Sequence, residues 1–446
     1  MSNNIVLKKG LNIPISGEAP LETMKTIVPD VVAVKPTDFK GFSPRLMVKE
    51  GDKVLAGSPV LADKQNPDIL LTSPVSGTVK EIVRGEKRKL LAVLVKAEGD
   101  EAVDFGAKDP KGLKAEEVKE TLLKSGLWPT IIQRPYGVLA NPAQTPKAVF
   151  VSAFSTAPLA ADSEFVFKDD FAAIQAGVTA VSKIAKVHVC VNSETSAFAK
   201  LQDAVLHTVI AKKHPAGNVG VQISHISPIM KGETVWTLSL LSLAAIGKLF
   251  LNGKLDLCRK VAVTGPAALK TGYVVAMPGT PMSALEGCFD PAVETRFISG
   301  DVLSGENIGK DGYLGFFDNQ VTLIKEGRER EVLGWANPLR FNQFSSSMAY
   351  FSWLLPKKKY NMDTNTHGGV RAFVCSDVYG KVLPMDIFPV YLVKACLAGD
   401  IDKMEQFGIY EVLPEDLALC EFVDPSKNDI QAIIQDGIDL MIKEMA

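Results

Sequence analysis

The stretch Val48-Lys-Glu-Gly-Asp-Lys-Val-Leu-Ala-Gly-Ser-Pro-Val-Leu61 is followed closely by a similar stretch, Pro74-Val-Ser-Gly-Thr-Val-Lys-Glu-Ile82. Both contain short alternating apolar runs interrupted by Gly and Pro. Alternation with period two predicts strands with one buried face, and the Gly and Pro residues predict tight turns between them. The pair therefore predicts a small antiparallel β-domain whose buried side chains include Val54, Val60, Val79 and Ile82.

The two stretches resemble the halves of the barrel-sandwich hybrid fold found in biotinyl and lipoyl domains. A carrier domain of that kind needs a lysine at the tip of the hairpin that joins the halves. At the lipoyl position this chain has Asn66, and Lys64 lies nearby without the neighbours usual for an attachment site. We therefore predict a structural barrel in which Lys64 is unmodified.

Beyond residue 100 the chain alternates between strand and helix patterns. A charged segment at 116–124 predicts a helix. Strands are expected at 148–153, 187–191 and 218–224, and helices at 169–184, 194–211 and 237–252. Alternation of this kind is typical of a mainly parallel sheet covered by helices, a Rossmann-like α/β domain. Such sheets commonly bind nucleotides or flavins at the carboxyl ends of their strands.

The pattern changes again after residue 258, where brief apolar runs lie among glycines in a way that resembles a small β-grasp domain of the soluble-ligand-binding (SLBB) type. The last part of the chain is mixed and ends at 429–445 with isoleucines spaced as in an amphipathic helix. At about 150 residues per domain, 446 residues predict several domains. We expect α/β multidomain architecture with boundaries at 1–100, 101–257, 258–330 and 331–446, the last carrying a helical tail.

Composition excludes several classes of function. The chain has 49 Lys and Arg against 51 Asp and Glu, without the sustained basic stripe that binds nucleic acid. The most apolar stretch, 238–251, is shorter than the roughly 20 residues of a membrane-spanning helix. The first residues lack the features of a signal peptide, so we expect the chain to remain on the side of the membrane where it is made.

The basic run Lys357–Lys359 is expected to be a solvated loop, with an acidic protein partner or lipid headgroups as the alternative.

Residues for catalysis or metal binding are not grouped in the sequence. The histidines occur singly, which argues against a metal site, and we expect structural roles for His214 and His367. Six cysteines lie far apart without a C-x-x-C pair, as expected for reduced and mostly buried thiols. The complete phosphate-binding and nucleophile motifs are missing. We therefore predict that the chain has no catalytic residues and no metal ligands of its own.

Many short motifs resemble the NqrA family, a component of the sodium-translocating NADH:quinone oxidoreductase, which is related to complex I and the Rnf complexes. They span residues 8 to about 390 and include Lys8-Lys-Gly10, Asp63-Lys64-Gln-Asn66-Pro67, Ser125-Gly-Leu-Trp128, His214-Pro-Ala-Gly217, Ile298-Ser-Gly300 and Leu383-Pro-Met-Asp386. The resemblance implies a multidomain subunit of a complex that oxidises NADH, reduces ubiquinone or menaquinone and exports Na⁺.

Two cofactor motifs of the relatives are missing. Flavin-binding members have a glycine-rich loop just before the Gly-Leu-Trp segment, where this chain has a helical sequence at 117–124 without glycine. Members with iron–sulfur clusters have four cysteines where this chain has Pro414, Leu417, Cys420 and Asp424. We therefore expect no tightly bound cofactor here, and expect FMN, FAD, iron–sulfur clusters and NADH in partner subunits.

One candidate ligand site remains, next to the position of the missing flavin loop. Trp128, Arg134, Tyr136 and Phe154 combine aromatic surface with hydrogen-bond donors, as a quinone headgroup requires. The alternative is an ordinary domain interface packed by Trp128 and Tyr136.

The resemblance implies a peripheral scaffold subunit on the cytoplasmic face of the bacterial inner membrane. Its partners would be the other subunits of the complex, chiefly the membrane component NqrB, and quinone. The enzymatic alternative is an electron-transfer subunit with its own flavin or cluster, as in the Rnf-type and complex I relatives. A binding module that presents a lipoyl-like or biotin-like group is the second alternative.

Overall fold

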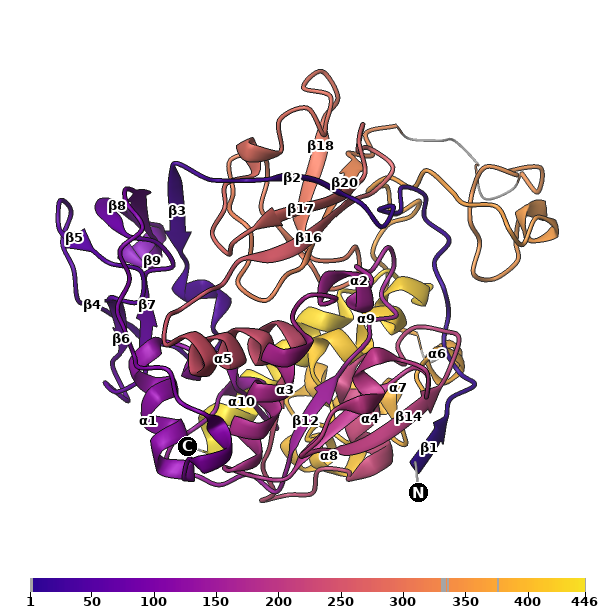
Figure 1. Cartoon of the computed structure of the whole chain (residues 1–446). Coiled ribbons are helices and arrows are strands. Elements are labelled where there is room, and N and C mark those ends of the chain that lie inside the picture. The colour runs from indigo at the N-terminus through magenta and orange to yellow at the C-terminus, as the bar shows by residue number, and fades with distance from the viewer. Residues whose placement is uncertain (1–2, 330–333, 335–336, 375–376, 446) are drawn as a thin grey trace.

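The structure is a computed structural model that describes residues 3–329, 334, 337–374 and 377–445. The barrel strands lie at one side of the molecule, the α/β domain fills the lower part, and a mixed sheet lies above it (Figure 1). The helices of the C-terminal region pack against the α/β domain. Cys375, one of the six cysteines, lies outside the described residues.

The barrel-sandwich domain consists of two small sheets, with strand orders β3-β9-β8-β5 and β4-β6-β7. Val54, Val60 and Val79 are buried as predicted, whereas Ile82 is half-buried. The strands are β3 (Val31–Val34), β4 (Pro44–Leu46), β5 (Lys53–Val54), β6 (Pro59–Asp63), β7 (Leu70–Thr72), β8 (Gly77–Arg84) and β9 (Leu90–Ala97).

The first residues of the chain belong to other sheets. Strand β1 (Asn3–Val6) pairs in parallel with β14 (Val205–Ile210) of the α/β domain, and β2 (Thr23–Thr26) pairs with β17 (Gly272–Ala276) of the upper sheet. Pairing of this kind satisfies backbone groups that would otherwise be exposed along a sheet edge. The segment 1–100, expected as one barrel domain, therefore also contributes strands to two neighbouring sheets.

The α/β domain is built on a seven-stranded sheet with the order β1-β14-β13-β12-β15-β10-β11. Strands β1, β14, β13, β12 and β15 are parallel, and β10 and β11 continue the sheet in antiparallel fashion. The remaining strands are β10 (Ile132–Arg134), β11 (Val138–Leu139), β12 (Val149–Ser152), β13 (Val187–Val191) and β15 (Val235–Leu238). The helices are α1 (Ala115–Ser125), α2 (Ser163–Val166), α3 (Phe171–Ser182), α4 (Val219–Ile226) and α5 (Leu240–Asn252).

Three element predictions in this domain were wrong in type or extent. The strand expected at 218–224 is helix α4, because its apolar residues also satisfy helical spacing. The helix expected at 194–211 is a short 3-10 turn followed by β14, which lies between two other strands of the sheet. The helix expected at 237–252 begins at Leu240, where Ser239 accepts the backbone N–H of Ser242 as an N-cap; β15 precedes it.

The upper sheet has the order β19-β18-β20-β16-β17-β2. Its strands β16 and β20 are parallel, and antiparallel partners lie on either side of that pair. The added strands are β16 (Arg259–Thr264), β18 (Thr295–Ser299), β19 (Glu306–Asn307) and β20 (Gln320–Lys325). The sheet agrees with the expected brief strands, and its identification as a β-grasp domain stays a prediction.

The C-terminal region is helical, as the sequence predicts. Its last helix buries Ile430, Ile434, Ile438 and Met441 completely, at the spacing expected for one face of a helix. The helices are α6 (Val378–Val382), α7 (Pro389–Ala398), α8 (Ile401–Phe407), α9 (Pro414–Val423) and α10 (Ile430–Met445). Within the described ranges, the structure contains no helix with the length and apolar character required to cross a membrane.

Two hydrophobic cores cross the domain boundaries. One contains Val60 and Val95 of the barrel together with Val149 and Leu243 of the α/β domain. The other joins Ile5 of β1 and Val209 of β14 to the C-terminal helices. Since shared cores resist domain separation, the barrel, the α/β domain and the helical region pack as one body.

Candidate functional site

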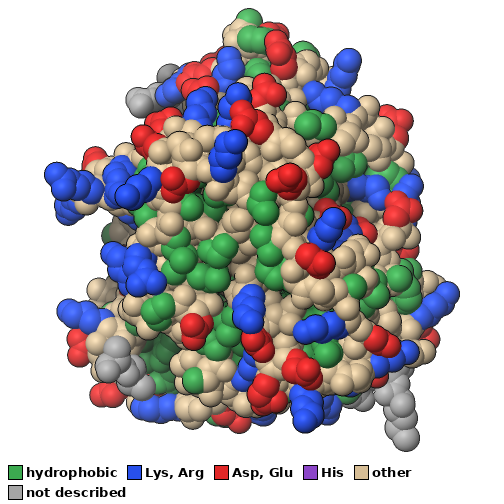
Figure 2. All heavy atoms as spheres, turned by 60° about the vertical axis from the view of Figure 1, so that its left-hand side comes forward, with side chains coloured by type: hydrophobic (Ala, Val, Ile, Leu, Met, Phe, Trp, Pro, Cys, Tyr) green, Lys and Arg blue, Asp and Glu red, His purple; other side chains and the backbone are tan. Residues whose placement is uncertain are grey.

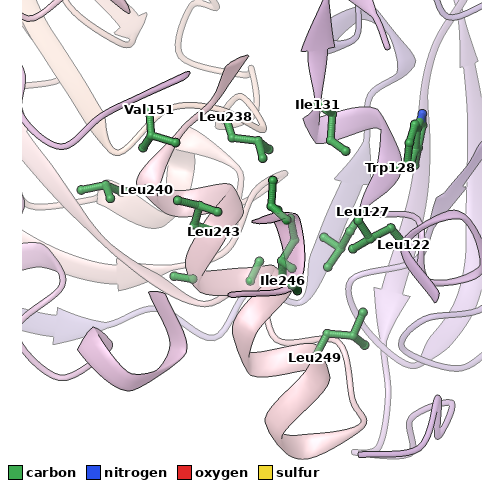
Figure 3. Packing of buried hydrophobic residues seen from close by; sticks show 14 of the residues in the cluster. Leu122, Leu127, Trp128, Ile131, Val151, Leu238, Leu240, Leu243, Ile246 and Leu249 are labelled. Atoms are coloured by element: carbon green, nitrogen blue, oxygen red, sulfur yellow. The ribbon is translucent and has the colours of Figure 1, made fainter. Parts of the chain in front are cut away.

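Trp128 lies inside the core between the barrel and the α/β domain (Figure 3). It begins a 3-10 turn (Trp128–Thr130), is fully buried, and donates its indole N–H to the carbonyl oxygen of Ala140 at 2.8 Å. Its ring packs edge-on against Trp236, with centroids 5.5 Å apart. Trp128 therefore presents neither an accessible face nor an unused donor in this structure.

Arg134, at the end of β10, is equally buried but at a different boundary. Its Nη1 donates to Oδ2 of Asp416 and its Nη2 to Oε1 of Glu415, each at 2.8 Å. Burial alone would lower the pKa of Arg134, but the two carboxylates offset that effect and raise it above its ordinary value. The guanidinium therefore links the α/β domain to the start of helix α9.

The two acidic partners differ in their environment. The side chain of Asp416 is completely buried, whereas that of Glu415 is 46% exposed. Oδ2 of Asp416 also accepts the backbone N–H of Leu413, which fixes the first turn of α9. Because the Asp416 carboxylate is surrounded by protein, Arg134 is the cation that compensates its charge.

Helix α4 approaches this ion pair closely because of Gly220. A Cβ atom at that position would lie 2.3 Å from Oδ2 of Asp416 and 2.5 Å from Nη1 of Arg134. The Asn218 side chain, just before α4, donates to the carbonyl oxygen of Glu415 at 3.1 Å. We call the set of Arg134, Asn218, Gly220, Glu415 and Asp416 the buried joint.

Tyr136 and Phe154 are half-buried and pack against the core that contains the C-terminal helices. The Tyr136 ring lies 6.3 Å from that of Tyr410, whose hydroxyl donates to Glu405 at 2.6 Å. The structure thus brings Arg134, Tyr136 and Phe154 to one seam between the α/β domain and the C-terminal region. Trp128 belongs to a different core, so the four predicted residues do not form one pocket.

The acidic half of the joint was missed from the sequence. Glu415 and Asp416 lie inside the stretch that we compared with the cluster motif, but at positions between the four expected ligands. Arg134 is separated from Asp416 by 282 positions along the chain. A pairing at that separation leaves no periodic signal, so only the fold reveals it.

The positions of the missing cluster are filled by protein packing. Leu417 and Cys420 are fully buried in the C-terminal core, and burial raises the pKa of the Cys420 thiol. Asp424 ends α9 and accepts the backbone N–H of Asn428 at 2.9 Å. No group of three or more potential metal ligands occurs in the part of the chain that the structure describes.

Helix α1 occupies the stretch where the sequence resemblance places the flavin loop of the flavin-binding related subunits. It begins with Glu117 accepting the backbone N–H of Lys114, and it buries Val118 and Leu122 completely. It ends at Gly126, which adopts a left-handed conformation against Thr72 of the barrel. The predicted helix is confirmed, and it packs the α/β domain against the barrel.

The tip of the barrel hairpin is ordered by Asp63 rather than by Lys64. The buried Asp63 carboxylate accepts backbone N–H groups from Ser43, Gln65 and Asn66 at 2.7 to 3.0 Å. Lys64 is exposed. The turn is therefore stabilised by an Asp that caps several backbone donors.

Two histidines that we did not single out form a stack across neighbouring strands. Nδ1 of His188 lies 2.8 Å from Nε2 of His207, and their rings are 5.1 Å apart beneath Phe150. Burial and the nearby His207 lower the pKa of His188 to about 4.

His214 is buried with Nδ1 3.2 Å from Oγ1 of Thr156, which agrees with the structural role expected for it.

Two recesses lie beside the upper sheet, one between it and the α/β domain and the other where both meet the barrel. Each has a cavity volume of about 30 Å³, and Leu257 and Phe316 line both. The second is also lined by Gly126 and Leu127, directly before Trp128, and by Lys35. Hydrophobic side chains gather across the middle of the face on the barrel's side of the molecule (Figure 2). These recesses could not be predicted from local patterns because the walls of the first come from two domains and those of the second from three.

The fold and site define a multidomain α/β protein in which a barrel-sandwich domain packs on an α/β domain. Comparison with family models agrees: residues 5–98 match the NqrA N-terminal barrel-sandwich hybrid domain, and residues 113–255 match the NqrA second alpha/beta domain.

Curated relatives extend this match over nearly the whole chain. The chain is 36% identical over 440 residues to the NqrA component of the Na⁺-translocating NADH-quinone reductase of Yersinia pestis bv. Antiqua, covering 97% of this chain and 98% of that one. It is 36% identical over 449 residues to the same component from Pasteurella multocida, covering 99% and 100%. The chain therefore belongs to the NqrA family of the Na⁺-translocating NADH-quinone reductase, and is a subunit of that translocase.

Among solved structures, the chain resembles a chain of an NAD⁺-reducing [NiFe]-hydrogenase in the H₂-reduced state. The TM-score is 0.38 and the sequence identity 11%, with coverage of 75% of this chain and 62% of that one. A likeness of this size says nothing further about function.

Proposed function

We propose that this chain is a peripheral scaffold subunit of the sodium-translocating NADH:quinone reductase, with no electron carrier of its own. The buried joint carries this proposal. It is an ion pair between the α/β domain and the helical region. Its two acidic residues lie between the four positions that align with the cluster cysteines of the related iron–sulfur subunits. Positions that correspond to flavin and cluster sites are occupied by packed side chains, which suits a subunit that supplies shape rather than chemistry.

An absorbance spectrum of the purified chain tests the cofactor part of this proposal. We expect no flavin band and no cluster band, because helix α1 replaces the glycine-rich loop and Cys420 is a single buried thiol. A stoichiometric flavin or iron–sulfur spectrum would instead support the alternative of an electron-transfer subunit. Intact mass tests the remaining alternative, since lipoate or biotin on Lys64 would add a defined adduct.

We place the chain on the cytoplasmic face of the bacterial inner membrane, docked chiefly on the membrane component NqrB. The names of its relatives support assembly into the complex, and shared hydrophobic cores would give docking a rigid body. Deleting the gene should abolish quinone reduction and Na⁺ export by the complex. Persistence of both activities in the deletion strain would show that the chain is dispensable.

Quinone contact stays part of the proposal, with two places to test. One is the predicted site of Trp128, Arg134, Tyr136 and Phe154. Its accessible part is Tyr136 and Phe154, since the other two side chains are buried. The other is the second recess, lined by Leu127 and Phe316, which offers apolar walls and the Lys35 ammonium and would have to widen beyond its cavity volume of about 30 Å³ to admit a headgroup.

Three variants of the assembled complex separate these places. Tyr136→Phe with Phe154→Ala removes a donor and an aromatic face at the seam, and Leu257→Trp fills the recesses. Loss of one such contact costs about 1–3 kcal/mol, so the variant at the true site should weaken quinone binding by about tenfold. Leu251→Trp, at an exposed position of α5, is the matched control. Unchanged quinone affinity in all variants would place the quinone on a partner subunit.

A further inference from the structure

The segment 337–360 exposes more large apolar side chains than its length would suggest. Figure 1 shows the chain after β20 extending away from the body, towards the right of the view. Met348 is 69% exposed, Leu354 54% and Trp353 51%. We call residues 337–360 the apolar lobe; its other exposed large apolar side chains are Leu339, Phe341, Phe351 and Leu355.

The lobe is anchored to the body through different residues. The backbone N–H of Tyr360 donates to Pro14 at 2.8 Å, and its carbonyl accepts the backbone N–H of Ser16 at 3.0 Å. Phe344 packs against the Tyr360 ring and against Phe422 of helix α9, at 6.0 and 6.3 Å. The inward side chains therefore fix the lobe, and the outward ones are available for another contact.

The lobe's own structure presents several of the exposed side chains together. A 3-10 turn spans Phe351–Leu354, and the backbone N–H of Phe351 donates to Pro338 at 2.9 Å. The Tyr360 hydroxyl donates to the carbonyl oxygen of Ser352, which is buried at the centre of the turn. With Ser352 directed inward, its neighbours Phe351, Trp353 and Leu354 remain exposed to solvent.

The charge of the lobe has one sign. Residues 337–362 contain Arg340 and the run Lys357–Lys359, and no Asp or Glu. Lys358 donates to the carbonyl oxygen of Phe341 at 3.0 Å, and Lys359 pairs with Glu18. These contacts hold the lysine run beside the apolar side chains, which combines cationic groups with an exposed Trp and Leu.

We propose that the apolar lobe docks on an anionic lipid surface. Trp and aliphatic side chains enter the boundary between headgroups and acyl chains, and adjacent lysines are attracted to anionic headgroups. The cores of protein interfaces are depleted in lysine, so three consecutive lysines beside the apolar residues favour lipid over a protein partner. This deepens the proposed function, on which it rests for the presence of a membrane nearby.

Vesicle flotation of the purified full-length chain tests this proposal without the complex. The chain should float with phosphatidylcholine vesicles that contain phosphatidylglycerol, and much less with phosphatidylcholine alone. Binding should weaken between about 0.1 M and about 1 M salt, because the screening length falls from about 10 Å to about 3 Å. Trp353 fluorescence should shift to shorter wavelength on binding, and Trp353→Phe should remove that shift.

Two variants identify the residues responsible. Trp353→Ala with Leu354→Ala should reduce vesicle binding at least about tenfold, since two large apolar groups are lost. Replacing Lys357 and Lys358 by Gln should do the same, at about fivefold for each lysine near the surface. Lys359 is kept because it pairs with Glu18. The matched control is Phe388→Ala with Tyr391→Ala, an equally exposed apolar pair at helix α7. It should bind vesicles like the unchanged chain.

Failure of this proposal is distinct from failure of the scaffold role. The lipid proposal is wrong if the chain floats with neither type of vesicle. It is also wrong if the lobe variants bind vesicles as well as the unchanged chain does. If the Trp353 and Leu354 changes impair assembly of the complex while the chain never binds vesicles, the lobe contacts another protein and the lipid proposal is wrong. The thermal unfolding midpoint verifies that each variant is folded.

Discussion

Trp128 and Trp353 each lie a few residues before a cation, Arg134 and Lys357, yet the two regions are opposite in character. Trp128 is fully buried and Arg134 is paired with two acids across a domain boundary. Trp353 is 51% exposed, in the apolar lobe, whose residues 337–360 include neither Asp nor Glu. The same local combination of residues thus holds domains together in one region and forms an exposed surface in the other.

The difference lies in what surrounds each cation. Arg134 meets acidic residues brought by helix α9 from the far end of the chain. The lysine run is placed beside exposed apolar groups, and Lys359 pairs at the surface with Glu18. A cation next to a tryptophan therefore does not by itself indicate a ligand site.

The largest expected contrast comes from truncating the two tryptophans. Trp128→Ala should lower the free energy of unfolding by about 3–5 kcal/mol, because it leaves a cavity in a packed core. Trp353→Ala should change it by less than about 0.5 kcal/mol, since the side chain is largely solvated. Chemical denaturation of both variants measures the difference. Equal effects would contradict the distinction between the two regions.

The free energy of unfolding should be nearly as sensitive to changes in the buried joint, but only at one of its two acidic residues. Asp416→Ala leaves Arg134 buried without its enclosed partner and should cost about 3–5 kcal/mol. Glu415→Ala removes the exposed partner and should cost about 0–1 kcal/mol. The same unfolding measurement compares them. A small effect of Asp416→Ala would mean that solvent reaches the joint.

Gly220 tests how closely the joint is packed. Gly220→Ala places a methyl group against Asp416 and Arg134, and should destabilise the protein by about 1–3 kcal/mol. Gly380→Ala is the helical control. It adds a methyl group where nothing lies within 4 Å, so it should stabilise the protein by about 0.5–1 kcal/mol. Similar results for both variants would show that the joint adjusts freely.

The smallest expected effect concerns the stacked pair of His188 and His207. The folded-state pKa of His188 is about 4, below its ordinary value of 6.5. As pH falls, the unfolded chain binds this proton first, so stability is present above about pH 6.5 and is lost between there and pH 4. We expect a loss of about 1–2 kcal/mol from this group near pH 5. His188→Phe should show a shallower decline in urea unfolding; an identical pH profile would contradict the assignment.

Much of the fold follows from patterns that are local in the sequence. The alternation in 48–82 and the helical spacing of 430–442 predict elements that the structure contains, because each pattern is imposed by burial of one face. The apolar residues of α4 failed as a predictor because their spacing fits either a strand or a helix. Motif matches along the chain identified the family, which the comparisons confirm.

Residue patterns were sufficient for the barrel strands, the terminal helix and the alternation of strands and helices in the α/β domain, since each depends on residues close together in the chain. They assigned the wrong type of element to β14 and α4. Three features required the folded chain: β1 and β2 complete distant sheets, Trp128 is enclosed, and Arg134 is paired with Asp416. The physical reason is that burial and charge compensation depend on which segments meet. Contact between two residues 282 positions apart, such as Arg134 and Asp416, depends on the packing of whole domains and not on the spacing of neighbouring residues.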